Sequence, residues 1–119
     1  MSGFLKVSER LDRFLRAFPH WESYGTEESW VIARGIIEEI LEAGRDVHVT
    51  VSPAVLDGDH GDPVHDCIAI TVVKWPRELI IDVYPDGRVE FLLSLETSEM
   101  GGTVGDRFTV GDLMRYLME

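Results

Sequence analysis

The spacing of apolar residues changes once along this chain, and the change limits the fold to a combination of helices and a sheet. Before Gly44, apolar residues recur every three or four positions, which is typical of helices with one buried face. This spacing predicts a first helix over residues 4–18, ended by Pro19, and a second helix over about 27–43 with Thr26 as its N-cap. Gly44 is expected to end the second helix in a left-handed conformation.

After Asp46, apolar and polar residues alternate, which predicts strands that each bury one face. The denser apolar run after Cys67 is expected to form a central strand. The Pro-Asp-Gly sequence at 85–87 favours a tight turn between two antiparallel strands. Four strands are expected, over residues 47–52, 67–74, 78–84 and 88–95.

The C-terminal quarter of the chain is expected to contain a loop and one short helix. Residues 96–107 include three glycines, which predicts a loop. Thr109 and Asp112 form a variant capping box at the start of the last helix. The predicted fold is therefore α+β, with two N-terminal helices, a four-stranded antiparallel meander and a short C-terminal helix, the helices packing on one face of the sheet. The length of 119 residues indicates a single domain over 1–119.

The charge of the chain is strongly negative and unevenly distributed. The formal net charge is −11, yet residues 1–20 carry four Lys or Arg against two Asp or Glu. A protein with this net charge repels phosphate backbones, which argues against direct binding of nucleic acid. No apolar run approaches the roughly 20 residues of a membrane span. The single cysteine, Cys67, can form no internal disulfide, so we expect a cytoplasmic protein that does not contact membranes.

The densest group of potential metal ligands lies in the predicted loop from Asp57 to Asp66. Two imidazoles and a carboxylate there make His60, His65 and Asp62 the candidate metal ligands. The spacing matches neither a zinc motif nor a calcium loop, and polar hairpin loops use the same residue types for their turns. Cys67 begins a predicted buried strand and lacks the setting of a reactive thiol. The sequence therefore predicts no catalytic residues and no cofactor.

Two aromatic residues, Trp21 and Tyr24, lie between the two predicted helices in the sequence Trp-Glu-Ser-Tyr-Gly. We expect them to fold back over the helix pair, although Trp and Tyr also anchor interfaces. This sequence resembles a loose group of small bacterial and phage-borne proteins that share a Trp-acid-x-Tyr-Gly motif after a first helix. Further shared features are Pro53 with the Asp57-Gly58 pair, Trp75, and the turn at 85–87. The loop from Asp57 to Asp66 and the C-terminal helix depart from the group's pattern. The resemblance implies an α+β fold and an accessory or defence-related role, and it implies no activity.

Together these features predict a small acidic protein-binding module that inhibits a basic partner such as a nuclease or toxin. An immunity protein, an antitoxin or a phage anti-defence protein such as an anti-CRISPR would fit, with surface carboxylates imitating nucleic-acid phosphates as a special case. The charge would steer association, although an acidic surface also serves solubility alone. The binding candidates are Trp21, Tyr24, Glu38, Glu39, Glu42, Asp57, Asp59, Asp62, Asp82, Asp86 and Glu90.

Two alternative functions remain open at this point. The first is a metal-dependent enzyme that uses the loop from Asp57 to Asp66. The second is a structural protein that forms a homodimer through an edge strand or through Trp21 and Tyr24.

Overall fold

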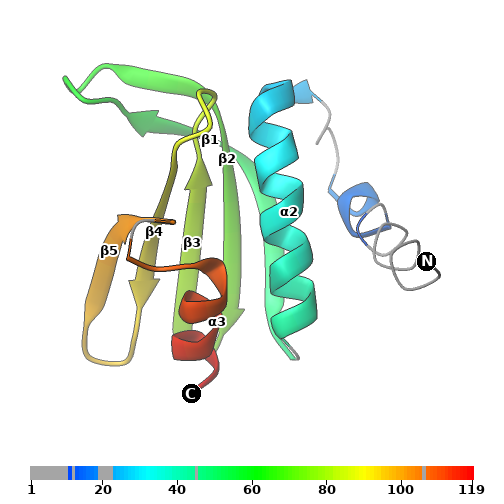
Figure 1. Cartoon of the computed structure of the whole chain (residues 1–119), viewed down its shortest axis with the longest axis vertical. Helices are drawn as coiled ribbons and strands as arrows, with labels where there is room; N and C mark the ends of the chain where they lie inside the picture. Colours follow the sequence, from blue (N-terminus) through cyan, green and yellow to red (C-terminus); the bar gives the residue numbers. More distant parts are fainter. Residues whose placement is uncertain (1–10, 12, 19–22, 45, 106) are drawn as a thin grey trace.

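The computed structural model describes residues 11, 13–18, 23–44, 46–105 and 107–119 of the chain. They form an α+β fold in which helices pack on one face of an antiparallel sheet (Figure 1). Residues 13–16 are helical and Leu15 is fully buried, which fits the predicted first helix, but residues 17–18 form a turn and a bend, so the helix ends before the predicted residue 18. Residues 1–10 and Pro19, which would complete and end that helix, lie outside the described residues.

Helix α2 runs from Glu27 to Ala43, which confirms its predicted bounds. Thr26 caps it as expected: its side chain accepts a hydrogen bond from the Ser29 amide, and the Ser29 hydroxyl accepts one from the Thr26 amide. The expected left-handed Gly44 is wrong, because Gly44 has φ −101° and is extended. Its lack of a side chain serves packing instead, since a Cβ there would lie 2.8 Å from Cε of Met114.

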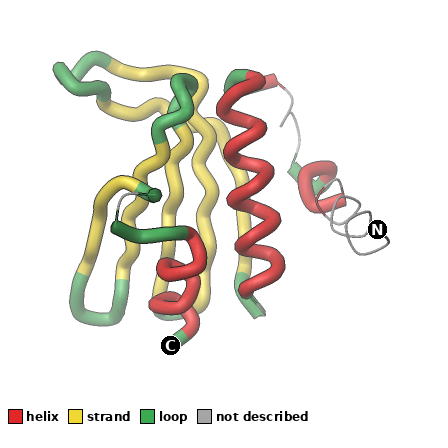
Figure 2. The backbone as a smooth tube through the Cα atoms, viewed as in Figure 1, coloured by secondary structure: helices red, strands yellow, loops and turns green. Residues whose placement is uncertain are grey.

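The sheet has five strands in the order β1-β2-β3-β4-β5, so each strand pairs with its sequence neighbours (Figure 2). All four pairings are antiparallel, as a meander requires. The strands are β1 His48–Asp57, β2 Pro63–Lys74, β3 Arg77–Val83, β4 Val89–Ser94 and β5 Glu99–Thr103. Helix α3, Val110–Met118, follows with the predicted Thr109–Asp112 capping box.

Two parts of the sheet differ from the sequence prediction. The expected loop at 96–107 contains the edge strand β5, in which Met100 lies opposite Leu93. Gly102 brings this strand close to the ring of Phe91, because a Cβ there would lie 3.3 Å from Cε1 of that ring. The first hairpin is also longer than predicted, so the turn between β1 and β2 occupies only residues 58–62.

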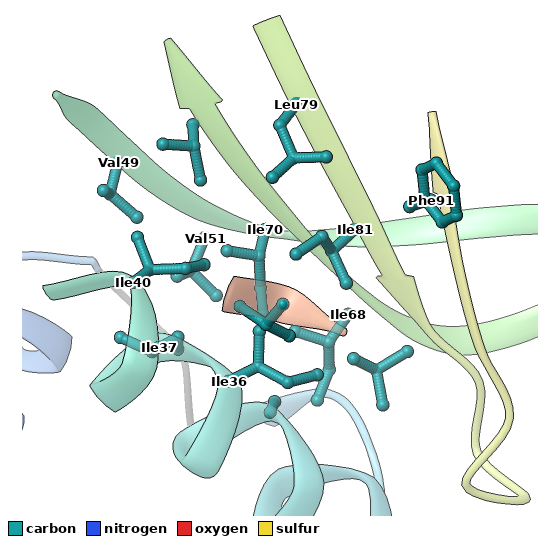
Figure 3. Close-up of a cluster of buried hydrophobic side chains, with 14 of the residues drawn as sticks. Ile36, Ile37, Ile40, Val49, Val51, Ile68, Ile70, Leu79, Ile81 and Phe91 are labelled. Carbon is teal, nitrogen blue, oxygen red and sulfur yellow. The ribbon is translucent and has the colours of Figure 1, made fainter. Parts of the chain in front are cut away.

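The core lies between the sheet and the helices. Cross-strand partners Val51, Ile70, Ile81 and Phe91 are buried in a row across four strands, and Ile36 and Ile40 of α2 lie on the same side of the sheet (Figure 3). Because side chains alternate along each strand, the residues between these positions point to the opposite face. The register of the sheet therefore decides which polar residues share that second face.

Candidate protein-binding surface

The second face of the sheet lies opposite the helices, and we call it the open face. Its residues are those that alternate with the buried core positions on each strand, and the pairing register places them in rows across the sheet. The strand residues of the open face include four carboxylates and neither Lys nor Arg, although Arg88, just before β4, contacts Glu90 of this face. Its members are His48, Thr50, Ser52, Ala69, Thr71, Val73, Glu78, Ile80, Asp82, Glu90, Leu92, Ser94, Glu99, Gly101 and Thr103.

One end of the sheet gathers two hairpin turns beside the start of α2. The Thr26 hydroxyl donates a hydrogen bond of 3.0 Å to the Pro85 carbonyl, which holds the β3–β4 turn against this helix. Nη1 of Arg88 lies 3.0 Å from Oδ1 of Asp59, which joins the same turn to the turn between β1 and β2. We call residues 57–66 and 82–90 the acidic end, because they contain seven Asp or Glu and a single Arg.

Arg88 is the only Lys or Arg of the acidic end, and contacts within the protein engage it. Its guanidinium lies 4.0 Å from the centre of the Tyr84 ring, and its Nε lies 3.7 Å from Oε1 of Glu90. The Tyr84 hydroxyl donates a 3.0 Å hydrogen bond to the other oxygen of Glu90. The hydrogen bond with Asp59 raises the pKa of Arg88, so Arg88 stays charged and offsets part of the surrounding negative charge.

Asp82 is the carboxylate of the acidic end whose pKa the fold raises. It is half-buried on β3 and lies directly opposite Glu90 on β4. The pKa of Asp82 is raised, mainly because burial disfavours the charged carboxylate and to a smaller extent because Glu90 carries a like charge. Among the described residues, none forms a hydrogen bond or an ion pair with the Asp82 carboxylate. A cation supplied by another molecule would therefore meet an unpaired, partly desolvated acid.

Two shallow clefts flank the turn between β1 and β2. The first has a volume of about 240 Å³ and lies between this turn and the β3–β4 turn. The second, of about 300 Å³, lies beside the bulge in β1 and is lined in part by Tyr24, His65 and Asp66. Cofactor sites have volumes of about 300–1,000 Å³ and enclose most of their ligand. The first cleft is smaller than this range, the second only reaches its lower end, and both are open to solvent.

The predicted binding residues fall into three groups. Asp59, Asp62 and Asp86 are exposed on the two turns, and Asp57 is exposed at the end of β1. Asp82 and Glu90 are half-buried on the open face. The second group, Glu38, Glu39 and Glu42, lies on α2 and belongs to neither surface.

The third group is the aromatic pair. Tyr24 is only 9% exposed, and its ring centre lies 5.5 Å from that of Trp30 in the core. Its buried position fits the expected packing role and argues against an interface anchor. Trp21 lies outside the described residues.

The structure does not assemble the predicted metal site. His60 and Asp62 lie in the exposed turn, whereas His65 lies on β2 beside the bulge. Within the described part of the chain, no group of three His, Cys, Asp or Glu side chains is placed to hold a metal ion. Cys67 is fully buried, burial raises the pKa of its thiol, and its Sγ donates to the Val64 carbonyl at 3.4 Å. This environment suits a structural thiol.

Three residues of these surfaces were not among the sequence candidates. Arg88 pairs with Asp59 of the neighbouring hairpin and stacks on Tyr84. No sequence pattern indicates these contacts. Trp75 is 88% exposed in the turn between β2 and β3. Its exposure could have been predicted from the sequence, because Trp75 precedes Pro76 and belongs to no predicted apolar stripe.

Comparisons with protein-family models, curated proteins and solved structures found no match to this chain. In the described residues, the helices are too short or too polar to cross a membrane.

Proposed function

We propose that this protein is a small acidic binding module that acts by occupying a basic protein partner. An inhibitor of a nuclease or toxin, such as an immunity protein, an antitoxin or a phage anti-defence protein, is the class that we favour. The observation that carries this proposal is the acidic end, where two hairpins carry seven carboxylates and a single Arg that is already engaged with Asp59 and Glu90. Such a module needs no catalytic group, because binding alone blocks the partner.

The charge layout supports recognition of a basic surface in two ways. Clustered carboxylates attract a positively charged partner and raise its association rate by roughly tenfold or more at low salt. Carboxylates on two projecting hairpins also offer acceptors to Lys and Arg side chains that otherwise contact phosphate. A partner that normally binds nucleic acid would therefore suit this surface, with the carboxylates imitating phosphates.

A capture experiment with matched variants tests the proposal. The protein is immobilised and exposed to bacterial or phage-infected lysates at about 50 mM and about 500 mM salt, since salt screens exposed charges. One variant, Asp57→Asn with Asp62→Asn and Asp86→Asn, neutralises three acids of the acidic end. The control, Glu38→Gln with Glu39→Gln and Glu42→Gln, neutralises three acids of α2.

We expect a basic protein to be captured at low salt by the wild type and by the α2 control, and to be lost with the acidic-end variant. Equal losses with both variants would mean that net charge alone governs capture. Capture that is the same at both salt concentrations and the same for the wild type and the acidic-end variant would also contradict the proposal.

A further inference from the structure

We infer that the open face docks an amphipathic basic helix of the partner, with the helix lying across the strands. This inference rests on the proposed function and deepens it by naming the surface and the segment that the surface takes. It follows from three observations: an apolar pair at the centre of the face, carboxylates in the rows on both sides of that pair, and an exposed Trp in the turn that follows β2.

The central row of the open face has two neighbouring apolar side chains, Ile80 and Leu92, where an open sheet face is usually polar. The other members of this row are Thr50, Thr71 and Gly101. Thr71, Ile80 and Leu92 are direct cross-strand partners on β2, β3 and β4. Leu92 is 39% exposed and Ile80 is half-buried, although both point away from the helices. At about 4.8 Å between strands, five strands span roughly 19 Å, which is the length of a helix of about 13 residues.

Each of the two rows beside this central row carries two carboxylates. Asp82 and Glu90 are partners in one neighbouring row, and Glu78 and Glu99 lie in the other, each opposite Ser94. Rows that share a face are about 7 Å apart. A helix about 10 Å wide that lies along the central row, over Ile80 and Leu92, therefore brings its own flanking Lys or Arg side chains within reach of both acidic rows.

The charges exclude a second copy of this chain as the favoured occupant. Two open faces brought together would oppose carboxylates to carboxylates, and the one Arg beside each face, Arg88, is already paired with Asp59 and Glu90. A basic occupant instead supplies the cation that the unpaired Asp82 lacks. The face therefore matches a helix with a narrow apolar stripe between two basic edges.

Trp75 lies in the turn between β2 and β3, next to the end of the open face. It lies two residues beyond Val73, which belongs to the open face, and it is 88% exposed. Trp is enriched among residues that dominate interface energies, and exposing a whole indole to water is unusual. Its indole also provides a spectroscopic probe at the margin of the face.

The test uses two synthetic peptides of about 14 residues and the full-length ¹⁵N-labelled protein. In the first peptide, Leu residues form a single helical stripe and Lys fills the other positions; the second has the same composition in a shuffled order without a stripe. Amide and indole shifts map the contact, and titration measures Kd. The variant Leu92→Ser removes the exposed apolar centre. Its control is Val31→Ser, which removes a 69% exposed apolar residue from α2.

We expect the striped peptide to shift open-face amides and the Trp75 indole, and to bind at least about fivefold more tightly than the shuffled peptide. Leu92→Ser should weaken binding about fivefold or more, and Val31→Ser should leave Kd unchanged. Absence of binding, equal binding of the two peptides, or shifts centred on α2 would overturn the inference. So would dimerisation that Leu92→Ser abolishes, since a second copy would then occupy the face.

One further comparison separates this inference from the proposed function. Suppose that the acidic-end variant abolishes peptide binding and Leu92→Ser leaves it unchanged. The peptide then does not dock on the open face, and the acidic end remains the recognition site. If binding depends on Leu92 and ignores the acidic-end variant, the docking surface stands and the proposed role of the acidic end fails.

Discussion

Arg88 and Asp59 are 29 residues apart in sequence, and their side chains meet at 3.0 Å between two hairpin turns. This contact attaches the long β1–β2 hairpin, which projects beyond the ends of β3 and β4 in Figure 1, to the rest of the sheet. It also places the one cation of the acidic end among carboxylates that would otherwise repel one another. The position of the acidic end thus depends on a contact between distant parts of the chain.

The variant Arg88→Met is expected to loosen the first hairpin without unfolding the helices. It leaves Asp59 and Glu90 without their cation and removes the stacking on Tyr84. Hydrogen exchange of the Gly58 and Gly61 amides should accelerate. Arg115→Met, which removes a pair with Asp112 inside α3, is the control and should leave those amides unchanged. Unaltered exchange in Arg88→Met would show that the bridge does not hold the hairpin.

Asp82→Asn is expected to stabilise the protein at about pH 7. Because the pKa of Asp82 is raised above its ordinary value of 3.8, the folded state retains this proton more readily than the unfolded chain. The Asp82 contribution to stability is therefore most favourable below that value and declines as pH rises through the folded-state pKa. The gain at neutral pH should be about 0.5 kcal/mol, the size of a cross-strand charge pair.

Urea unfolding of Asp82→Asn and wild type at about pH 7 and about pH 3 checks this prediction. The two proteins should differ at neutral pH and converge in acid, where both side chains are uncharged. The exposed variant Glu42→Gln serves as the control for a simple change in net charge. A loss of stability at neutral pH in Asp82→Asn would contradict the prediction.

Thr26→Ala should cost more than Thr109→Ala, although both residues cap helices. Both lose an N-cap hydrogen bond worth about 1 kcal/mol, but Thr26 also donates to the Pro85 carbonyl in the β3–β4 turn. We therefore expect about 2 kcal/mol for Thr26→Ala and about 1 kcal/mol for Thr109→Ala in the free energy of unfolding. Thr26→Ser keeps the hydroxyl and should recover most of the loss. Equal costs for the two alanine variants would argue against the tertiary role of Thr26.

Ile81→Ala and Ile80→Ala test which face of the sheet is covered. Ile81 is fully buried beneath the helices, so its truncation should cost about 3–4 kcal/mol. Ile80 points to the open face, and its truncation should cost less than about 1 kcal/mol. Thermal or urea unfolding of both variants measures the difference. Similar costs would mean that the open face is covered in the folded protein.

Local sequence patterns were sufficient for the elements that depend on local interactions. The bounds of α2, both N-caps and the order of the three central strands follow from apolar periodicity, capping residues and the turn at 85–87. Strand β5 escaped prediction because Glu-Met-Gly-Gly-Thr has no apolar alternation. Its backbone is ordered by hydrogen bonding to β4, which only the folded sheet provides.

The candidate site shows the same division between local and tertiary causes. Composition alone determines a net charge of −11 and names the acids, including Asp57, Asp59, Asp62 and Asp86 on and beside the turns. It does not reveal that Tyr24 packs in the core, or that His60, His65 and Asp62, all of them described residues, form no three-residue group able to hold a metal ion. Sheet register sets Asp82 opposite Glu90, and the contact of two hairpins surrounds Arg88 with acids. Charge is an additive property of the residues, whereas a charged surface depends on distances that only tertiary packing determines.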